Sequence, residues 1–418
     1  MGGQAGQGRI MQEGILQEGD KRKRGTGRKT ENGRSGRRGM AVRVVAAALS
    51  LLLLVNGLAA ANRLLCVKSQ DGIDQARALY HQPENSIDVV FLGSSHVHCN
   101  IDTAYLWTEY GIAAYDYSAA EQPLWMTYYW LREFCKTQKP KLVVLDVYSP
   151  AAYEADYQYR WMEENLFGMR FSANKWEMMQ ASVEKKRLSD YFPAFTVYHQ
   201  RYTEVNREDW DYLTGRIELQ NFKGFHPLFG TVHVDLDGLM AASDATASGV
   251  PDAPCPGATD ASNPGEERRL SAKSEKYLRK IISYTRKRNI PLALISAPYQ
   301  KHPAEDAVLR QIEQIAAEEK LPFADFCRES SQIGIDEDRD MNDVSHLNYR
   351  GSRKYTAYLA AYLARYAALP DHRGDRRYRS WDISAEKTEA EAAAAGMGQA
   401  SDTGAGKAAA EGGLESDL

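Results

Sequence analysis

The stretch DVVFLGSSHVHCN, residues 88–100, decides the fold, because four apolar residues lead directly into Gly-Ser-Ser-His. Continuous rather than alternating hydrophobicity is typical of a strand buried on both faces, as in a parallel sheet covered by helices. Gly93 permits a tight turn, and Ser95 then stands at the carboxyl end of the strand, where open parallel sheets meet their ligands. A serine at this position is also an ordinary helix N-cap, so it does not establish a site by itself.

Similar apolar runs recur along the chain and alternate with segments of helical periodicity. The expected strands lie within residues 87–93, 112–118, 141–149 and 290–298, with a weaker fifth strand at 322–327. The expected helices lie at 123–138, 273–288 and 304–319. This alternation predicts an α/β fold, a three-layer α/β/α sandwich around a mostly parallel five-stranded sheet.

An apolar segment near the N-terminus predicts attachment to a membrane. Residues 44–61 carry no charge and have about the length of a transmembrane helix, and four arginines lie between residues 34 and 43. The positive-inside rule places the N-terminus in the cytoplasm and the rest of the chain outside the cell membrane. We expect an anchor over residues 44–65. The alternative is a cleavable signal peptide, since Ala59, Ala60 and Ala61 offer small residues at a cleavage site.

The first 43 residues hold eleven Lys or Arg and four acids, a net charge of about +7 against about −11 for the rest. We expect them to form a basic, disordered cytoplasmic segment. The alternative for residues 1–39 is that translation begins at Met40. Because the apolar segment follows at once, a membrane rather than nucleic acid is the expected partner.

Residues 66–382 are expected to form one domain with a long insertion. The first part of the insertion, residues 150–270, is aromatic and is expected to pack as helices over one edge of the sheet. Its later part, near 240–268, and the tail at 383–418 have compositions typical of disorder. The five cysteines are scattered and show neither zinc-ligand spacing nor a disulfide framework.

A second informative block, NDVSHLNYRGSRKYTAYLAAYLARY, covers residues 342–366. Asp343 can accept the Nδ1 hydrogen of His346 and leave Nε2 facing outward as a base. Asn348 can cap the helix that follows. An Asp-x-x-His pair alone is more often a surface turn. Its combination with a serine after the first strand predicts a catalytic Ser-His-Asp set.

These two blocks, together with YDYSAAEQPLWMTYYWLREFCKTQKPKLVVLDVYS, resemble the SGNH/GDSL hydrolase family. The chain is similar in particular to the membrane-anchored, extracytoplasmic branch of Gram-positive bacteria, which is related to the D-alanyl transfer protein and to polysaccharide O-acetylation proteins. The resemblance covers residues 85–150 and 290–366, and it implies the flavodoxin-like SGNH hydrolase fold.

The resemblance implies that Ser95 is the nucleophile, His346 the general base and Asp343 its orienting acid. It also implies an oxyanion hole built from the backbone amides of Ser95 and Glu121. Ser94 replaces the aspartate of the family's first block.

The glycine of the second block is absent, and the asparagine of the third has no clear counterpart. Losing one oxyanion donor costs about 2.7 to 4 kcal/mol in the transition state, so we expect a slower or narrower enzyme, or a substitute donor.

The expected function is an extracytoplasmic serine esterase or O-acyltransferase that acts, without a cofactor, on acetyl-like groups of cell-envelope carbohydrate. The alternative is a non-catalytic envelope protein of the same fold that binds a glycan or assists a membrane acyltransferase. The departures in the second and third blocks favour this alternative, and the intact Ser, His and Asp set disfavours it.

Four further side chains are candidates for substrate binding: His96, Asp146, His199 and Arg201. His96 and His98 alternate in a way that could suit a metal, but without a nearby carboxylate they more often pack or face solvent, and no metal is expected. Asp146 could instead satisfy loop amides, and His199 and Arg201 could belong to a packed amphipathic helix.

Overall fold

The computed structural model describes residues 31–66, 71–152, 156–192, 195–236 and 268–397. Two units are described separately, residues 1–60 and the domain from residue 61 onward. The predictions for residues 1–30, 240–267 and 398–418 lie outside the described residues.

The N-terminal helix α1 (Glu31–Leu65) is long and apolar enough to cross a membrane over Gly39–Leu65. This span of 27 residues forms a helix about 40 Å long, which exceeds the roughly 30 Å thickness of a bilayer core. A signal sequence would have the same properties. The expectation of disorder up to residue 43 is wrong from residue 31 onward, because the helix continues through the preceding basic stretch.

The domain is built on a five-stranded sheet in which every pairing is parallel. Its strands are β1 (Val89–Gly93), β2 (Ala114–Ser118), β3 (Leu142–Asp146), β4 (Leu292–Ser296) and β5 (Phe323–Asp325). Each lies inside one of the five predicted runs. The strand order is β2-β1-β3-β4-β5, the doubly wound order of flavodoxin-like folds, in which the winding reverses at β1 and β3.

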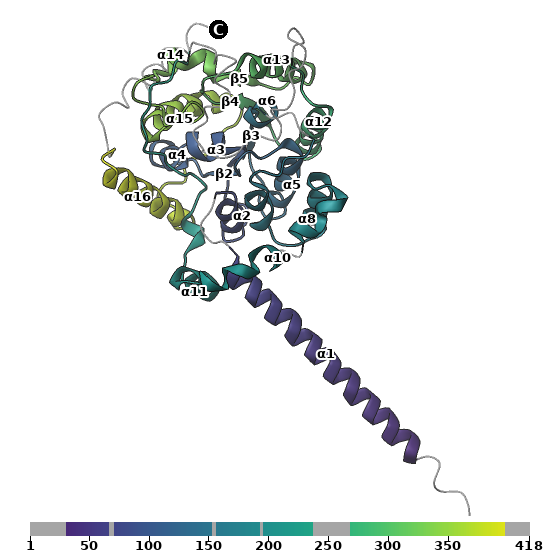
Figure 1. The fold of residues 1–418 in the computed structure, drawn as a ribbon. Helices are drawn as coiled ribbons and strands as arrows, with labels where there is room; N and C mark the ends of the chain where they lie inside the picture. Colours follow the sequence, from purple (N-terminus) through teal and green to yellow (C-terminus); the bar gives the residue numbers. More distant parts are fainter. Residues whose placement is uncertain (1–30, 67–70, 153–155, 193–194, 237–267, 398–418) are drawn as a thin grey trace, which may run out of the picture. The chain divides into compact units, whose positions relative to one another are not determined.

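Both faces of the sheet are covered, which explains the uninterrupted apolar runs. In β1, Val90 and Leu92 face one hydrophobic cluster, whereas Val89 and Phe91 face the other. The helices are α2 (Ile73–Leu79), α3 (Ser95–Asn100), α4 (Thr103–Tyr110), α5 (Leu124–Phe134), α6 (Tyr148–Ala152), α12 (Ala272–Arg286), α13 (Pro303–Glu318), α14 (Ser330–Ile333), α15 (Tyr349–Leu363) and α16 (Arg379–Ala394). In Figure 1, α4 and α15 lie on one side of the sheet and α5 and α12 on the other. The three-layer sandwich is therefore confirmed.

The insertion contains α7 (Met162–Phe167), α8 (Ala173–Ser182), α9 (Leu188–Tyr191), α10 (Phe195–Tyr198) and α11 (Arg207–Thr214), with the 3₁₀ turns η1 (Lys185–Arg187), η2 (His199–Thr203) and η3 (Leu219–Asn221). Two further 3₁₀ turns are η4 (Phe326–Glu329) and η5 (Arg376–Tyr378). Helix α8 packs on α5. At the edge strand β2, Asp116 N donates to the carbonyl of Lys223 over 2.9 Å. The insertion therefore covers both α5 and one edge of the sheet.

The prediction of a disordered tail from residue 383 is wrong for residues 383–397, because α16 continues to Ala394. Trp381, Ala385, Thr388 and Ala392 are buried and recur at spacings of three and four residues. They form a narrow face of small residues beside one tryptophan, and α16 packs with it on α4. The low apolar bulk of this segment concealed the face.

Candidate active site

Ser95 is the first residue of α3 and lies two residues after the end of the interior strand β1. The turn depends on Gly93, whose φ of 149° is strained for any residue with a side chain. A Cβ there would lie 2.9 Å from the Cβ of Asp146 and 3.0 Å from Cγ2 of Val97. The sharp turn brings the hydroxyl of Ser95 to the carboxyl end of the sheet, at the point where the winding reverses. Ser95 is partly exposed, whereas Ser94 beside it is buried.

The loop that carries His346 is held from both sides. Asn348 caps α15, since its Oδ1 accepts hydrogen bonds from Arg350 N at 3.1 Å and Gly351 N at 3.2 Å. On the other side, Leu347 N donates to Oδ1 of Asn100, the last residue of α3, over 3.0 Å. One short helix therefore begins at Ser95 and at its end holds the backbone beside His346.

The structure brings Ser95, His346 and Asp343 within hydrogen-bonding distance. His346 Nε2 lies 2.8 Å from Ser95 Oγ, although 251 residues separate them in the sequence. His346 Nδ1 lies 2.9 Å from Oδ1 and 3.0 Å from Oδ2 of Asp343. With Nδ1 protonated and donating to the carboxylate, Nε2 is free to accept the hydroxyl hydrogen of Ser95. This is the geometry of a nucleophile, a base and an orienting acid.

The carboxylate of Asp343 is held in its ionised form. Burial acts to raise its pKa, but the hydrogen bond and the charge of His346, with donors from Asn342 and Ser345, hold the pKa well below its usual range. Oδ1 accepts from Ser345 N at 2.8 Å and from His346 N at 3.0 Å. Asn342 Nδ2 donates to Oδ2 over 2.9 Å. These donors hold the carboxylate beside the imidazole of His346.

His96 is enclosed by aromatic rings rather than open to a substrate. Its ring stacks on Tyr148, with centroids 3.6 Å apart, and meets the rings of Tyr299 and His346 edge-on at 5.0 Å and 5.4 Å. Neither ring nitrogen of His96 has a hydrogen-bond partner. Burial, reinforced by the charge of His346, lowers its pKa well below the ordinary value. A neutral His96 therefore packs against the ring of His346, and its fully buried position does not favour substrate binding.

Asp146 accepts hydrogen bonds from loop amides, which was the alternative to substrate binding. Its Oδ1 accepts from Tyr148 N at 3.1 Å and its Oδ2 from Ala297 N at 3.2 Å, and the residue is only 1% exposed. Burial raises its pKa to about 7, against the lowering effect of the two amides. Asp146 joins the ends of β3 and β4 beside the turn at Gly93 rather than facing a ligand.

Glu121 lies in the loop after β2 and has a left-handed backbone, with φ of 47°. Its carboxylate accepts a hydrogen bond from Gln158 Nε2 at 2.6 Å and lies 3.4 Å from Nη1 of Arg160. These contacts hold the loop that contains the backbone amide expected to serve as an oxyanion donor.

The other candidates have partners elsewhere. His98 Nδ1 lies 2.9 Å from Ser118 Oγ, and burial lowers the pKa of His98 to about 4 despite the nearby charge of Asp71. His96 and His98 thus point to different neighbours, and among the described residues no group of three His, Cys, Asp or Glu is placed to hold a metal.

Arg201 donates to the carbonyl of Leu65 at 2.6 Å and pairs with Asp209 at 3.6 Å. It thus holds the chain at the end of α1. His199, in the same turn η2, is exposed. The contacts of Arg201 therefore favour a structural role over substrate binding.

Three residues that support this site were missed from the sequence: Asn100, Tyr148 and Tyr299. Tyr148 follows β3 and Tyr299 follows β4, so both lie at the carboxyl end of the sheet, as Ser95 does. That position was the available signal. Their ring contacts with His96 depend on packing between β1, β3 and β4, which no local pattern reveals.

Comparisons with known proteins give only distant likenesses. A candidate acylhydrolase from Bacteroides fragilis matches 68% of this chain and 90% of its own, with 11% identity and a TM-score of 0.33. A gut microbial diltiazem-metabolizing enzyme matches 68% of this chain and 47% of its own, with 13% identity and a TM-score of 0.23. No family model matches the chain, and no curated protein matches it. Because the likenesses are so distant, the functional argument rests on the geometry around Ser95.

Proposed function

We propose that the protein is a membrane-anchored, extracytoplasmic serine esterase or O-acyltransferase of the SGNH type. The observation that carries the proposal is the hydrogen-bonded series from Ser95 Oγ through His346 to Asp343, with contacts of 2.8 Å and 2.9 Å. A chain of contacts between three side chains of these types, at the carboxyl end of an open parallel sheet, suits nucleophilic catalysis.

The proposed reaction proceeds through an acyl-enzyme. His346 Nε2 takes the proton of Ser95 as Oγ forms a bond to the ester carbonyl carbon. The tetrahedral oxyanion is bound by the backbone amides of Ser95 and Glu121. As the intermediate collapses, the carbon–oxygen bond to the alcohol breaks and His346 returns its proton to the departing oxygen. Water then releases the acid, or a second alcohol accepts the acyl group.

The proposed substrate is an acetyl-like ester of cell-envelope carbohydrate. The carbohydrate and the envelope follow from the family resemblance and from the apolar span at Gly39–Leu65. The arginines before residue 44 support a cytoplasmic N-terminus and an extracytoplasmic domain. With water as the final acceptor the protein acts as an esterase, and with a sugar hydroxyl it acts as an O-acyltransferase.

The test is labelling of the full chain, in detergent, by a fluorescent fluorophosphonate that reacts with activated serines. We expect labelling of the wild type and its loss in Ser95→Ala and His346→Ala. Ser94→Ala is a matched control, because the hydroxyl of this buried neighbouring serine has no hydrogen-bond partner, and this variant should keep its label. Equal labelling of wild type and Ser95→Ala would reject the proposal and favour the non-catalytic alternative, a glycan-binding or acyltransferase-assisting envelope protein.

A further inference from the structure

The insertion contacts the chain at the point where the apolar span ends. Arg201, in the turn η2, donates a hydrogen bond from Nη1 to the carbonyl oxygen of Leu65 over 2.6 Å. Its Nη2 lies 3.6 Å from Oδ2 of Asp209, in α11. Figure 1 shows α10 and α11 at the point where the chain enters the domain. Arg201 therefore joins η2 and α11 to the first residues of the domain.

Apolar packing strengthens this contact. Leu65 and Cys66 form a small hydrophobic cluster with Tyr198, the last residue of α10, and three partly buried side chains pack against it: Phe167, Val197 and Val205. Tyr198 is only 3% exposed. The end of the apolar span is thus held by the insertion through both a hydrogen bond and buried apolar surface.

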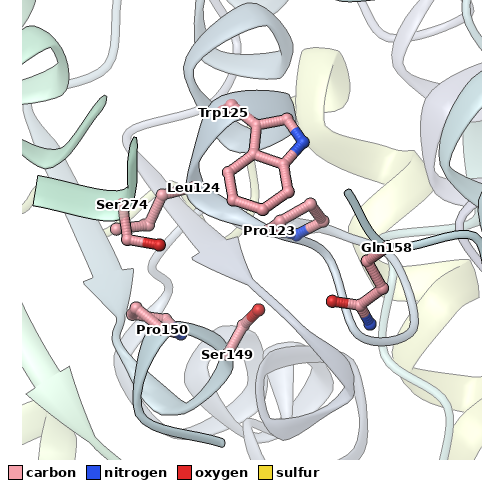
Figure 2. A pocket seen from close by; sticks show the side chains of 7 residues that line it. All are labelled: Pro123, Leu124, Trp125, Ser149, Pro150, Gln158 and Ser274. Carbon is pink, nitrogen blue, oxygen red and sulfur yellow. The ribbon is translucent and has the colours of Figure 1, made fainter. Parts of the chain in front are cut away.

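Two aromatic side chains next to this contact are exposed. Tyr202 follows Arg201 and is 71% exposed, the largest fraction for any aromatic side chain that the structure describes. Trp210 follows Asp209 and is 51% exposed, whereas Trp125, which lines the small recess in Figure 2, is 2% exposed. Large aromatic rings normally bury most of their surface, so two exposed rings beside one contact indicate a surface that meets a partner.

The length of the apolar helix identifies the partner. A bilayer measures about 40 to 45 Å with its headgroup layers, of which about 30 Å is hydrocarbon. The 27 residues of Gly39–Leu65, at about 1.5 Å each, cover about 40 Å. In a membrane-anchored chain, Leu65 therefore reaches the headgroup layer of the outer leaflet. Because Arg201 is bonded directly to Leu65, the residues that adjoin Arg201 lie at the same layer.

The residue types suit a lipid interface. Tryptophan and tyrosine are enriched where membrane meets water, because each ring combines an apolar body with one polar group. Residues 199–218, which include both exposed rings, hold three basic and five acidic side chains. This excess of acid offers no attraction to anionic lipids, so the contact depends on the aromatic rings rather than on charge.

We propose that Tyr202 and Trp210 form a second membrane contact, which places this part of the insertion in the headgroup layer of the outer leaflet. The inference rests on the membrane anchor of the proposed function and adds to it a surface of the domain itself. The partner is the interface of a zwitterionic lipid bilayer rather than another protein.

The experiment measures quenching of tryptophan fluorescence in the full chain, reconstituted in nanodiscs of phosphatidylcholine with brominated acyl chains. Helix α1 contains no tryptophan, so quenching reports contact between the domain and lipid. Trp210→Phe removes the expected reporter. Trp161→Phe and Trp176→Phe are its matched controls, because these tryptophans are also exposed, at 38% and 36%.

A second pair of variants tests the contact without removing a reporter. Tyr202→Glu places a charge in the proposed surface. Tyr366→Glu is the matched control, because Tyr366 is also an exposed tyrosine but packs on Tyr362, outside the cluster around Leu65. Fluorophosphonate labelling of Ser95 shows which variants are folded, and Trp210→Phe alone decides the result if Tyr202→Glu does not fold.

We expect the brominated lipid to quench the wild type, and Trp210→Phe to lower the quenched fraction about threefold or more, with about twofold for Tyr202→Glu. Trp161→Phe, Trp176→Phe and Tyr366→Glu should retain the quenching. Because charge does not supply the contact, high salt or added phosphatidylglycerol should leave the quenched fraction unchanged.

The anchor and the second contact fail in different ways. If the chain resists carbonate extraction but shows no quenching, the surface is rejected and the anchor stands; the exposed rings then fit a protein partner. Equal loss in Trp210→Phe and Trp176→Phe, or quenching only with phosphatidylglycerol, also overturns the surface. If carbonate releases the chain, the anchor and the surface are rejected together, whereas the loss of Ser95 labelling in the wild type would reject only the proposed catalysis.

Discussion

The substitution Asp343→Asn tests how the acid orients His346. Oδ1 of Asp343 accepts two backbone amides, from Ser345 at 2.8 Å and from His346 at 3.0 Å. In the variant, the amide oxygen will occupy this position, because only an acceptor fits it. The new NH₂ group then replaces Oδ2 and lies about 3 Å from two atoms that donate in the wild type, Asn342 Nδ2 and His346 Nδ1.

The consequence is a change in the imidazole tautomer. His346 Nδ1 then lies 2.9 Å from the amide oxygen, an acceptor, and 3.0 Å from the NH₂ group, a donor; in the molecules in which Nδ1 accepts from the NH₂ group, the ring proton moves to Nε2. That nitrogen can then no longer take the proton of Ser95 over the 2.8 Å contact. A misplaced tautomer of this kind costs about 10⁴-fold in kcat. This corresponds to about 5.4 kcal/mol in the activation free energy.

The assay is kcat for 4-nitrophenyl acetate at neutral pH, together with the rate of fluorophosphonate labelling. Asp338→Asn is a matched control, since Asp338 pairs with His233 at 2.8 Å on the surface, and its rates should equal those of the wild type. A folded Asp343→Asn variant that loses less than about tenfold would refute the orienting role. Because the pKa of Asp343 is lowered, its carboxylate stays ionised across the neutral range, and acid pH alone cannot imitate the variant there.

Three other predictions address stability and topology. Gly93→Ala should lower the free energy of unfolding, measured in urea, by about 2 to 4 kcal/mol, because backbone strain at a φ of 149° adds to Cβ contacts at 2.9 Å and 3.0 Å. Gly215→Ala is the control: its φ is 72° but the space around it is open, so it should cost only about 1 to 2 kcal/mol, and equal costs would contradict the crowding argument. In the folded protein the pKa of Asp146 is raised to about 7, so Asp146 keeps a proton that the unfolded chain loses near pH 4. The free energy of unfolding of the wild type should therefore fall, relative to Asp146→Asn, by about 1.4 kcal/mol per pH unit between pH 4 and pH 7, and level off above pH 7. Parallel stability–pH profiles of the two proteins would exclude a raised pKa. The full chain should remain with membranes in high salt and in alkaline carbonate and be released by detergent. Protease added outside intact cells should digest the domain but spare residues 1–43. Release by carbonate, or a soluble chain that begins near Asn62, would favour a cleaved signal sequence.

The sequence by itself determined the local elements of this protein. Five apolar runs predicted five strands, because burial on both faces of a sheet requires uninterrupted hydrophobicity within each run. Asn348 was recognised as a helix cap for the same kind of reason, since a cap acts on amides two or three residues away. The same local criteria failed at α16, where one tryptophan and a few alanines form a buried face that composition alone does not reveal.

Only the tertiary structure decided which side chains meet. The strand order β2-β1-β3-β4-β5 and the 2.8 Å contact between Ser95 and His346 join residues that are far apart in the chain. Asp146 and His96 were candidates for binding until packing placed one between two loop amides and the other among three aromatic rings. The physical reason is that periodicity and capping depend on near neighbours in the sequence, whereas burial and hydrogen bonding of a side chain depend on whichever distant segments fold against it.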